Sequence, residues 1–97
     1  MATYVSLSNF TDQGIKSIKD TVKRSEALRE GAKAAGITVK EILWTQGQYD
    51  LVLIFEAPDD ATVSALALSA ARLGNVRGQT LRAFTAGEMT KILEKVV

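Results

Sequence analysis

One stretch decides the fold: Trp44-Thr45-Gln46-Gly47-Gln48-Tyr49-Asp50, followed directly by Leu51-Val52-Leu53-Ile54-Phe55. Its five consecutive apolar residues are typical of a strand that is buried on both faces. The segment before them is typical of a hairpin connection, in which Gly47 adopts a positive φ without a steric penalty. The stretch therefore predicts an antiparallel strand pair with a buried second strand, and it indicates no reaction.

Alternation of side chains predicts four strands in all. They cover Ala2–Ser8, Ile37–Thr45, Tyr49–Glu56 and Val76–Thr85. Helical spacing of apolar residues predicts one long amphipathic helix from Ile15 to Ala35 and an Ala-rich helix from Val63 to Leu73. A short amphipathic tail helix, residues Glu88 to Val97, follows the last strand.

The order βαββαβ with a terminal helix is that of the ferredoxin-like fold. Right-handed crossovers then place both long helices on one face of a four-stranded antiparallel sheet. At 97 residues the chain is predicted to form one α+β domain, residues 1–97.

The sheet face without helices is the informative part of this prediction. If Val5, Leu7, Leu81 and Ala83 lie under the helices, the open face carries Tyr4, Ser6, Thr80, Arg82 and Phe84. The middle strands add apolar residues to both faces, so a partner is expected to cover the open face. A second copy of the chain is the simplest partner, in a homodimer or a higher homo-oligomer. The alternative is that the tail helix covers part of the open face within the monomer.

Composition excludes several classes of function. The chain has no cysteine and no histidine, which removes thiolate chemistry, the usual metal ligands and the usual general base. We therefore expect no metal and no cofactor, and no catalytic set is identified. A net charge of +1 with interspersed signs argues against nucleic-acid binding. Without a spanning stretch or a signal peptide, a cytoplasmic location is expected, with no membrane contact.

Five residues are candidates for contact with a small molecule: Tyr4, Trp44, Tyr49, Asp50 and Arg82. Each has a structural alternative. Trp44 could pack in the core or an interface, and Tyr49 and Asp50 could hold the turn through packing and backbone hydrogen bonds. A strand arginine needs a partner, which is an anionic ligand or an internal carboxylate such as Asp50, Glu41 or Glu56. By parity Arg82, and not Arg77, shares a face with Tyr4 and Trp44.

The motifs of the chain, taken together, resemble those of the GYD-domain family over nearly the whole sequence. The resemblance is carried by Thr11-Asp12-Gln13-Gly14-Ile15-Lys16, Lys23-Arg24, Trp44 to Asp50, Glu56-Ala57-Pro58-Asp59-Asp60, Leu73-Gly74-Asn75-Val76-Arg77 and Thr80-Leu81-Arg82-Ala83-Phe84. The Gly-Tyr-Asp signature has the form Gly-x-Tyr-Asp here, since Gln48 stands between Gly47 and Tyr49. The resemblance implies a small bacterial ferredoxin-like domain of the dimeric α/β-barrel type. It implies little about activity.

The Gly-x-Tyr-Asp turn, the Asp-capped helix and the Leu-Gly-Asn-Val step are also similar to the effector-binding domains of Lrp/AsnC-type regulators. That similarity implies small-molecule binding at subunit interfaces, without a DNA-binding helix-turn-helix in this chain. Our first hypothesis is accordingly a homo-oligomeric module that binds an anionic or amide-bearing ligand at the sheet rim or a subunit interface. The alternatives are a cofactor-free oxygenase-like or isomerase-like enzyme and a purely structural or protein-interaction role.

Overall fold

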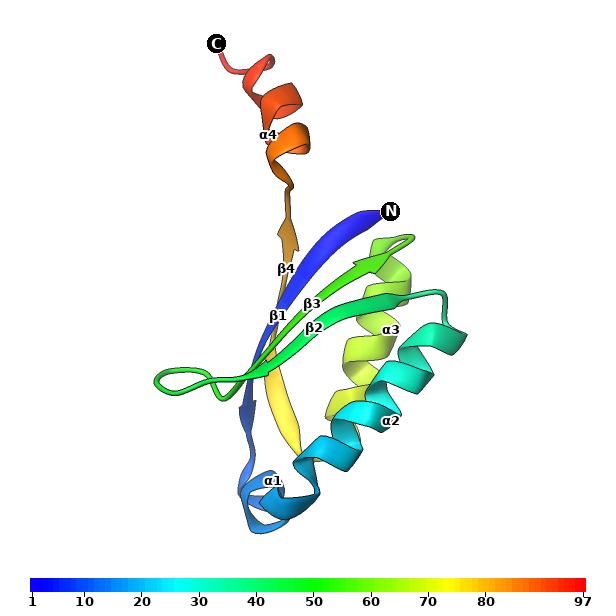
Figure 1. The fold of residues 1–97 in the computed structure, drawn as a ribbon, viewed down its shortest axis with the longest axis vertical. Helices are drawn as coiled ribbons and strands as arrows, with labels where there is room; N and C mark the ends of the chain where they lie inside the picture. Colours follow the sequence, from blue (N-terminus) through cyan, green and yellow to red (C-terminus); the bar gives the residue numbers. More distant parts are fainter.

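The computed structural model describes residues 1–97 and contains one four-stranded sheet with helices between and after its strands (Figure 1). The strands are β1 (Ala2–Phe10), β2 (Thr38–Trp44), β3 (Leu51–Ala57) and β4 (Val76–Ala83). The helical segments are α1 (Asp12–Lys16), the 3-10 turn η1 (Ile18–Asp20), α2 (Thr21–Ala34), α3 (Asp60–Ala71) and α4 (Ala86–Leu93). The predicted strands are all present, with ends displaced by one or two residues.

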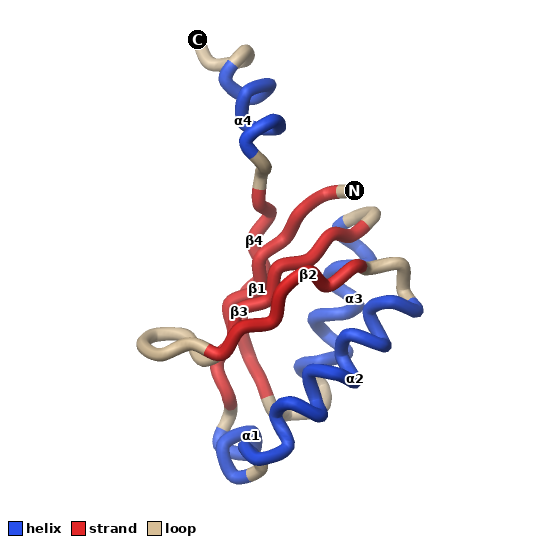
Figure 2. Tube along the Cα trace, in the orientation of Figure 1, coloured by secondary structure: helices blue, strands red, loops and turns tan.

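All three strand pairs are antiparallel, and the strands lie in the order β2-β3-β1-β4. Both long helices, α2 and α3, cover the same face of the sheet (Figures 1 and 2). This arrangement confirms the predicted α+β ferredoxin-like fold. It leaves β2 and β4 as edge strands and β3 and β1 in the centre.

The hydrophobic core lies between the sheet and the two long helices. Along β3 the side chains alternate, with Leu51, Leu53, Phe55 and Ala57 buried against the helices. The remaining buried apolar residues are Tyr4, Ala32, Ile37, Val39 and Val63. Asp59 caps α3, since its carboxylate accepts the Thr62 N–H at 2.7 Å.

The strand pairing shows that the expected assignment of sheet faces is wrong for β1 and β4. Tyr4, Ser6 and Ser8 point toward the helices, and the β4 residues opposite them are Arg82, Thr80 and Gly78. Tyr4 is only 4% exposed, because its ring stacks on Phe55 at 5.7 Å between centroids. Trp44, opposite the buried Leu51 of β3, lies on this helix side as well.

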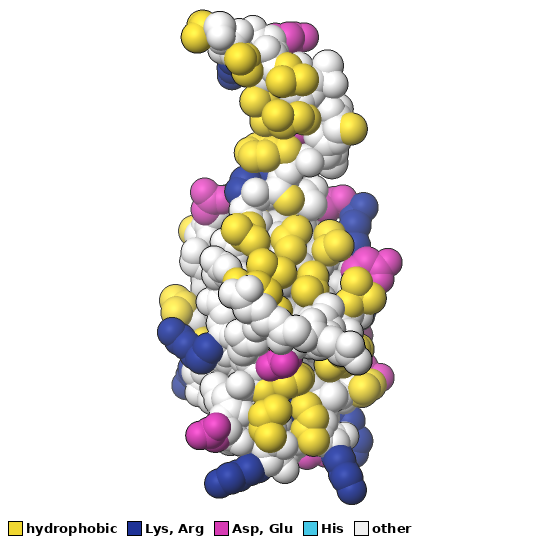
Figure 3. All heavy atoms as spheres, turned by 90° about the vertical axis from the view of Figure 1, so that its left-hand side faces the viewer, with side chains coloured by type: hydrophobic (Ala, Val, Ile, Leu, Met, Phe, Trp, Pro, Cys, Tyr) yellow, Lys and Arg dark blue, Asp and Glu magenta, His cyan; other side chains and the backbone are white.

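The open face consequently carries Val5 and Leu7 of β1 and Leu81 of β4, which were expected under the helices. The middle strands add Leu43 of β2 and Val52 and Ile54 of β3 to the same face. Figure 3 views this face and shows hydrophobic side chains gathered over the sheet. The prediction of an apolar open face is therefore strengthened, although its residues differ from those expected.

The long helix predicted from Ile15 to Ala35 is interrupted, which is a second correction. Thr11 caps α1 by accepting the Gly14 N–H at 3.1 Å, and α1 ends at Lys16 before the η1 turn. Apolar spacing continues through the break, so the sequence pattern did not mark it. The break lets α1 sit against the loop that leads from α3 into β4, where the Thr11 N–H donates to the Asn75 carbonyl at 3.0 Å.

The helix α4 continues away from the body of the molecule and does not fold back over the open face of its own chain (Figures 1 and 2). This overturns the alternative in which the tail covers that face within the monomer. The radius of gyration is 14.6 Å, compared with about 12.5 Å for a compact domain of this length. No helix in the chain has the length and the apolar character needed to cross a lipid bilayer.

Gly14 gives the first prediction, because a Cβ at this position would lie 2.1 Å from the Asn75 carbonyl oxygen. Gly14→Ala should destabilise the protein by about 1–3 kcal/mol, since this contact requires a backbone shift. Gly31→Ala is the matched control, because nothing lies within 4 Å of the Cβ it would add in the interior of α2. It should stabilise the protein by about 0.5–1 kcal/mol. Urea unfolding of both variants checks the pair, and equal effects would refute the close approach.

Candidate functional site

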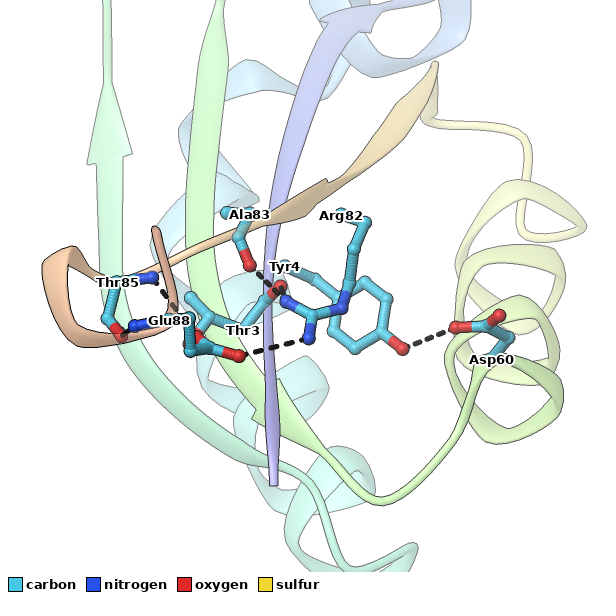
Figure 4. Close-up of polar contacts among 7 residues, drawn as sticks. All are labelled: Thr3, Tyr4, Asp60, Arg82, Ala83, Thr85 and Glu88. Carbon is cyan, nitrogen blue, oxygen red and sulfur yellow. Dashed lines mark hydrogen bonds and ion pairs between the residues drawn. The ribbon is translucent and has the colours of Figure 1, made fainter. Parts of the chain in front are cut away.

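Tyr4 and Arg82 face each other on the neighbouring strands β1 and β4 and form the centre of a polar cluster (Figure 4). The Tyr4 hydroxyl donates a hydrogen bond of 2.5 Å to the Asp60 carboxylate at the start of α3. This bond holds the phenol neutral and is the main reason that the pKa of Tyr4 is raised above 10.0. Burial and the charge of Asp60 act in the same direction, whereas Arg82 partly offsets them.

The Arg82 guanidinium uses its donors within its own chain. It forms an ion pair with Glu88 of α4 at 3.2 Å and donates to the carbonyl oxygens of Thr3 and Ala83. It also lies over two aromatic rings, 4.6 Å from the centroid of Phe84 and 5.7 Å from that of Tyr4. Arg82 is therefore paired with a carboxylate of its own chain, one of the two kinds of partner expected. That carboxylate is Glu88, whereas Asp50, Glu41 and Glu56 had been suggested.

Glu88 connects this cluster to the first turn of α4. Thr85 and Glu88 form a capping box, in which the Thr85 N–H donates to the Glu88 carboxylate at 3.0 Å and the Glu88 N–H donates to the Thr85 hydroxyl at 3.2 Å. The Thr85 N–H and then Arg82 lower the pKa of Glu88 below its ordinary value. Together these bonds fix the direction in which α4 leaves the sheet.

Trp44, Tyr49 and Asp50, the other three candidates, lie near the opposite end of the sheet and apart from Tyr4 and Arg82. The Trp44 indole N–H donates to the Thr21 hydroxyl at 3.0 Å, and the side chain is 43% exposed. The Tyr49 hydroxyl accepts a hydrogen bond from Gln79 of β4 at 2.8 Å. Asp50 accepts the Phe10 N–H at 3.0 Å and so ties the end of β1 to the hairpin. Gly47 in this hairpin has φ +97°, as the turn required.

A groove between α3 and β4 is the feature that the sequence analysis missed. Three hydroxyls, those of Ser6, Ser8 and Thr80, lie on the helix side of the sheet below Ala67 and Ala70 of α3. The inner part of the groove has a volume of about 60 Å³ and the outer part about 210 Å³. The sequence does contain an indication of this groove. Ser6 and Ser8 alternate along the first strand, and short hydroxyl side chains leave space beneath a helix that larger apolar side chains would fill.

These side chains offer hydrogen bonds, ion pairs and apolar surface. No group of acidic side chains is arranged to hold a metal ion. The ion pairs are Arg82–Glu88 and Lys40–Glu56, the latter at 2.7 Å between β2 and β3. The hydroxyls of the groove can donate and accept hydrogen bonds, and the apolar open face can bury surface against a partner.

The Tyr4–Asp60 bond predicts a pH dependence. Since the folded-state pKa of Tyr4 is raised, its contribution to stability is fully present below pH 10 and is lost as the pH rises through the raised value. Subtracting the phenolate absorbance of Tyr4→Phe from that of the wild type isolates the titration of Tyr4, whose midpoint should lie above pH 10.0. Asp60→Asn is the control: in this variant the Tyr4 titration, isolated by the same subtraction, should have a lower midpoint because the carboxylate is gone. An unchanged midpoint in Asp60→Asn would contradict the assignment.

Comparison with known proteins agrees with the geometry of the chain. The GYD domain family matches residues 4–93. A protein from Thermus thermophilus, described as a glutamine synthetase and cystathionine beta-lyase binding protein, is 32% identical over 90 residues, which cover 92% of this chain and 95% of the relative. The match spans every strand and the helices between them, so the chain belongs to the GYD-domain family.

Proposed function

We propose that this chain is a protein-binding module that assembles with itself, as a dimer or a higher homo-oligomer, through its open sheet face. The observation that carries the proposal is the apolar character of that face. Val5, Leu7, Val52 and Ile54 lie on the two central strands, on the side away from α2 and α3, and are half-buried there. Toward the edges of the same face, Leu43 is 47% and Leu81 42% exposed. Polar residues stand toward its margins, among them Asn9, Glu41 and Arg77, which is the arrangement of an interface with an apolar centre and a polar rim.

A second apolar surface supports the binding of another protein. Between Asp60 and Arg72 the helix α3 carries no charged residue, and Leu68 on its outer side is 68% exposed. The exposed residues of α3 include the small or apolar Ala61, Ala65 and Leu68 beside Ser64 and Ser69, so the helix offers a partner an uncharged surface. With the open sheet face occupied by a second copy, the outer side of α3 stays available to a different partner.

The description of the Thermus relative gives the kind of partner to try first. That relative is named for binding two enzymes, glutamine synthetase and cystathionine beta-lyase. We extend this to the present chain as part of the proposal, with residues 1–97 acting as one cytoplasmic domain. The catalytic alternatives, an oxygenase-like or isomerase-like enzyme, gain no arrangement of acid and base from the geometry.

Sedimentation velocity tests both halves of the proposal in one measurement. The chain alone at low micromolar concentration should sediment as a homo-oligomer, and with purified glutamine synthetase or cystathionine beta-lyase it should co-sediment. Ile54→Lys should release monomers, because a charge is placed at the centre of the apolar face. Leu68→Lys should keep the oligomer and weaken enzyme binding at least tenfold.

The matched control is Ala34→Lys, which adds the same side chain to an exposed position of α2. It should change neither the oligomer nor enzyme binding. A wild-type chain that sediments as a monomer would refute self-association, whereas an oligomer that binds neither enzyme would refute the choice of partner.

A small-molecule ligand is the second candidate, and the groove between α3 and β4 is the observation that favours it. Its hydroxyls suit an anionic or amide-bearing ligand, and Tyr4 with Arg82 lies farther along the same side of β1 and β4. The other sequence candidates, Trp44, Tyr49 and Asp50, do not line this groove. Glutamine and glutamate at millimolar concentration are suitable probes in a thermal-shift assay. Binding should raise the melting temperature, and Ser8→Ala should reduce that rise; no rise with either probe would count against this candidate.

A further inference from the structure

The helix α4 is amphipathic, and its apolar side has no cover in its own chain. Met89 and Leu93 lie on this side and are 44% and 56% exposed. The first turn is nevertheless held firmly by the capping box and by the Arg82–Glu88 ion pair. These contacts orient α4 away from the sheet that it leaves.

The apolar side of α4 faces the same way as the open sheet face. Figure 3 shows hydrophobic side chains along α4 and over the sheet on one side of the molecule. The open sheet face and the apolar side of α4 therefore form one apolar surface, and a partner long enough to extend past the end of the sheet would contact both.

The exposed area is large enough for a stable pair. The chain exposes 6649 Å², whereas a compact monomer of 10.5 kDa exposes about 5,400 Å². The excess of about 1,200 Å² compares with the roughly 800 Å² that each partner buries in a standard interface. Association of two copies would thus remove the surface that the extended shape leaves exposed.

We propose that α4 is an exchanged arm: in a two-fold pair, the α4 of each copy packs with Met89 and Leu93 on the open sheet face of the other. This proposal rests on the self-association proposed above and specifies how the two copies meet. A second copy is the occupant because the same chain carries both the arm and the apolar sheet that can receive it. A two-fold axis turns one copy over, so that each arm points back across the sheet of its partner.

The receiving surface fits an aliphatic helix. The strands present Val5, Leu7, Val52, Ile54 and Leu81, and none of these side chains has a polar group that the arm would leave unsatisfied. The polar side of α4, with Lys91 and Glu94, would remain toward solvent. The contact therefore buries apolar side chains without burying a charge.

The first experiment measures the dissociation constant of the homodimer by sedimentation equilibrium in two matched variants. Leu93→Gln changes the apolar side of α4 and should weaken the dimer at least tenfold. Lys91→Gln introduces the same side chain on the opposite side and should change the constant less than twofold. Equal effects of the two variants would overturn the proposal.

The second experiment locates the arm by cross-linking, for which the absence of cysteine from the chain is an advantage. Copies with Met89→Cys on the arm are mixed with copies carrying Leu7→Cys on the open sheet face, and a bismaleimide is added. The mixture should give a covalent heterodimer. A control mixture with Ala65→Cys, on the helix side of the molecule, should not.

The outcomes separate the two proposals. A wild-type chain that is monomeric removes self-association and the exchanged arm together. A wild-type dimer in which Met89→Cys fails to cross-link to Leu7→Cys removes the exchanged arm and leaves the self-association proposal standing. Cross-linking to Ala65→Cys in place of Leu7→Cys would assign the arm to the helix side and would also overturn the inference.

Discussion

The structure depends on one constraint: β3 is apolar on both faces, and the chain supplies helices for only one of them. Leu51, Leu53 and Phe55 are buried beneath α2 and α3, while Val52 and Ile54 point to the other side. An aliphatic surface of this kind is unfavourable in water in proportion to its area. The other exposed apolar features, along α4 and on the outer side of α3, show that the isolated chain leaves several surfaces uncovered.

The fold was predictable because its signals are local. Period-two alternation, the Gly-centred hairpin and the order of elements led directly to the ferredoxin-like arrangement, whereas the family was indicated by the resemblance of particular motifs. The sheet face toward which each set of side chains points was harder to predict. Periodicity determines which side chains of a strand share a face, but not whether that face lies under the helices. In β1 both alternatives looked suitable, since Tyr4 is aromatic and Val5 and Leu7 are aliphatic. The choice is made by contacts distant in sequence: Tyr4 stacks on Phe55 and bonds to Asp60.

The candidate residues show the same division between local and distant information. Parity correctly placed Arg82 with Tyr4, but its partner Glu88 depends on the direction in which α4 leaves the sheet. Asp50 was expected to accept backbone N–H groups, and it does so from Phe10, 40 positions earlier in the chain. The groove under α3 was not anticipated, because serines in a strand were assigned to the exposed side by their polarity. Ser8 is in fact buried there, beside the short side chains of α3.

The contacts around Gly14 also bear on the order in which the chain folds. The Thr11 hydroxyl donates to the Gly74 carbonyl, and the Gln13 amide donates to the Leu73 carbonyl, across separations of 63 and 60 residues. Contacts at such separation require closure of a long loop, whose entropic cost must be met before the contacts themselves can form. The β2–β3 hairpin, by contrast, needs only its own short turn. We therefore expect the hairpin to form early and the edge strand β4 to dock late, so that α4, which follows β4, reaches its final position last.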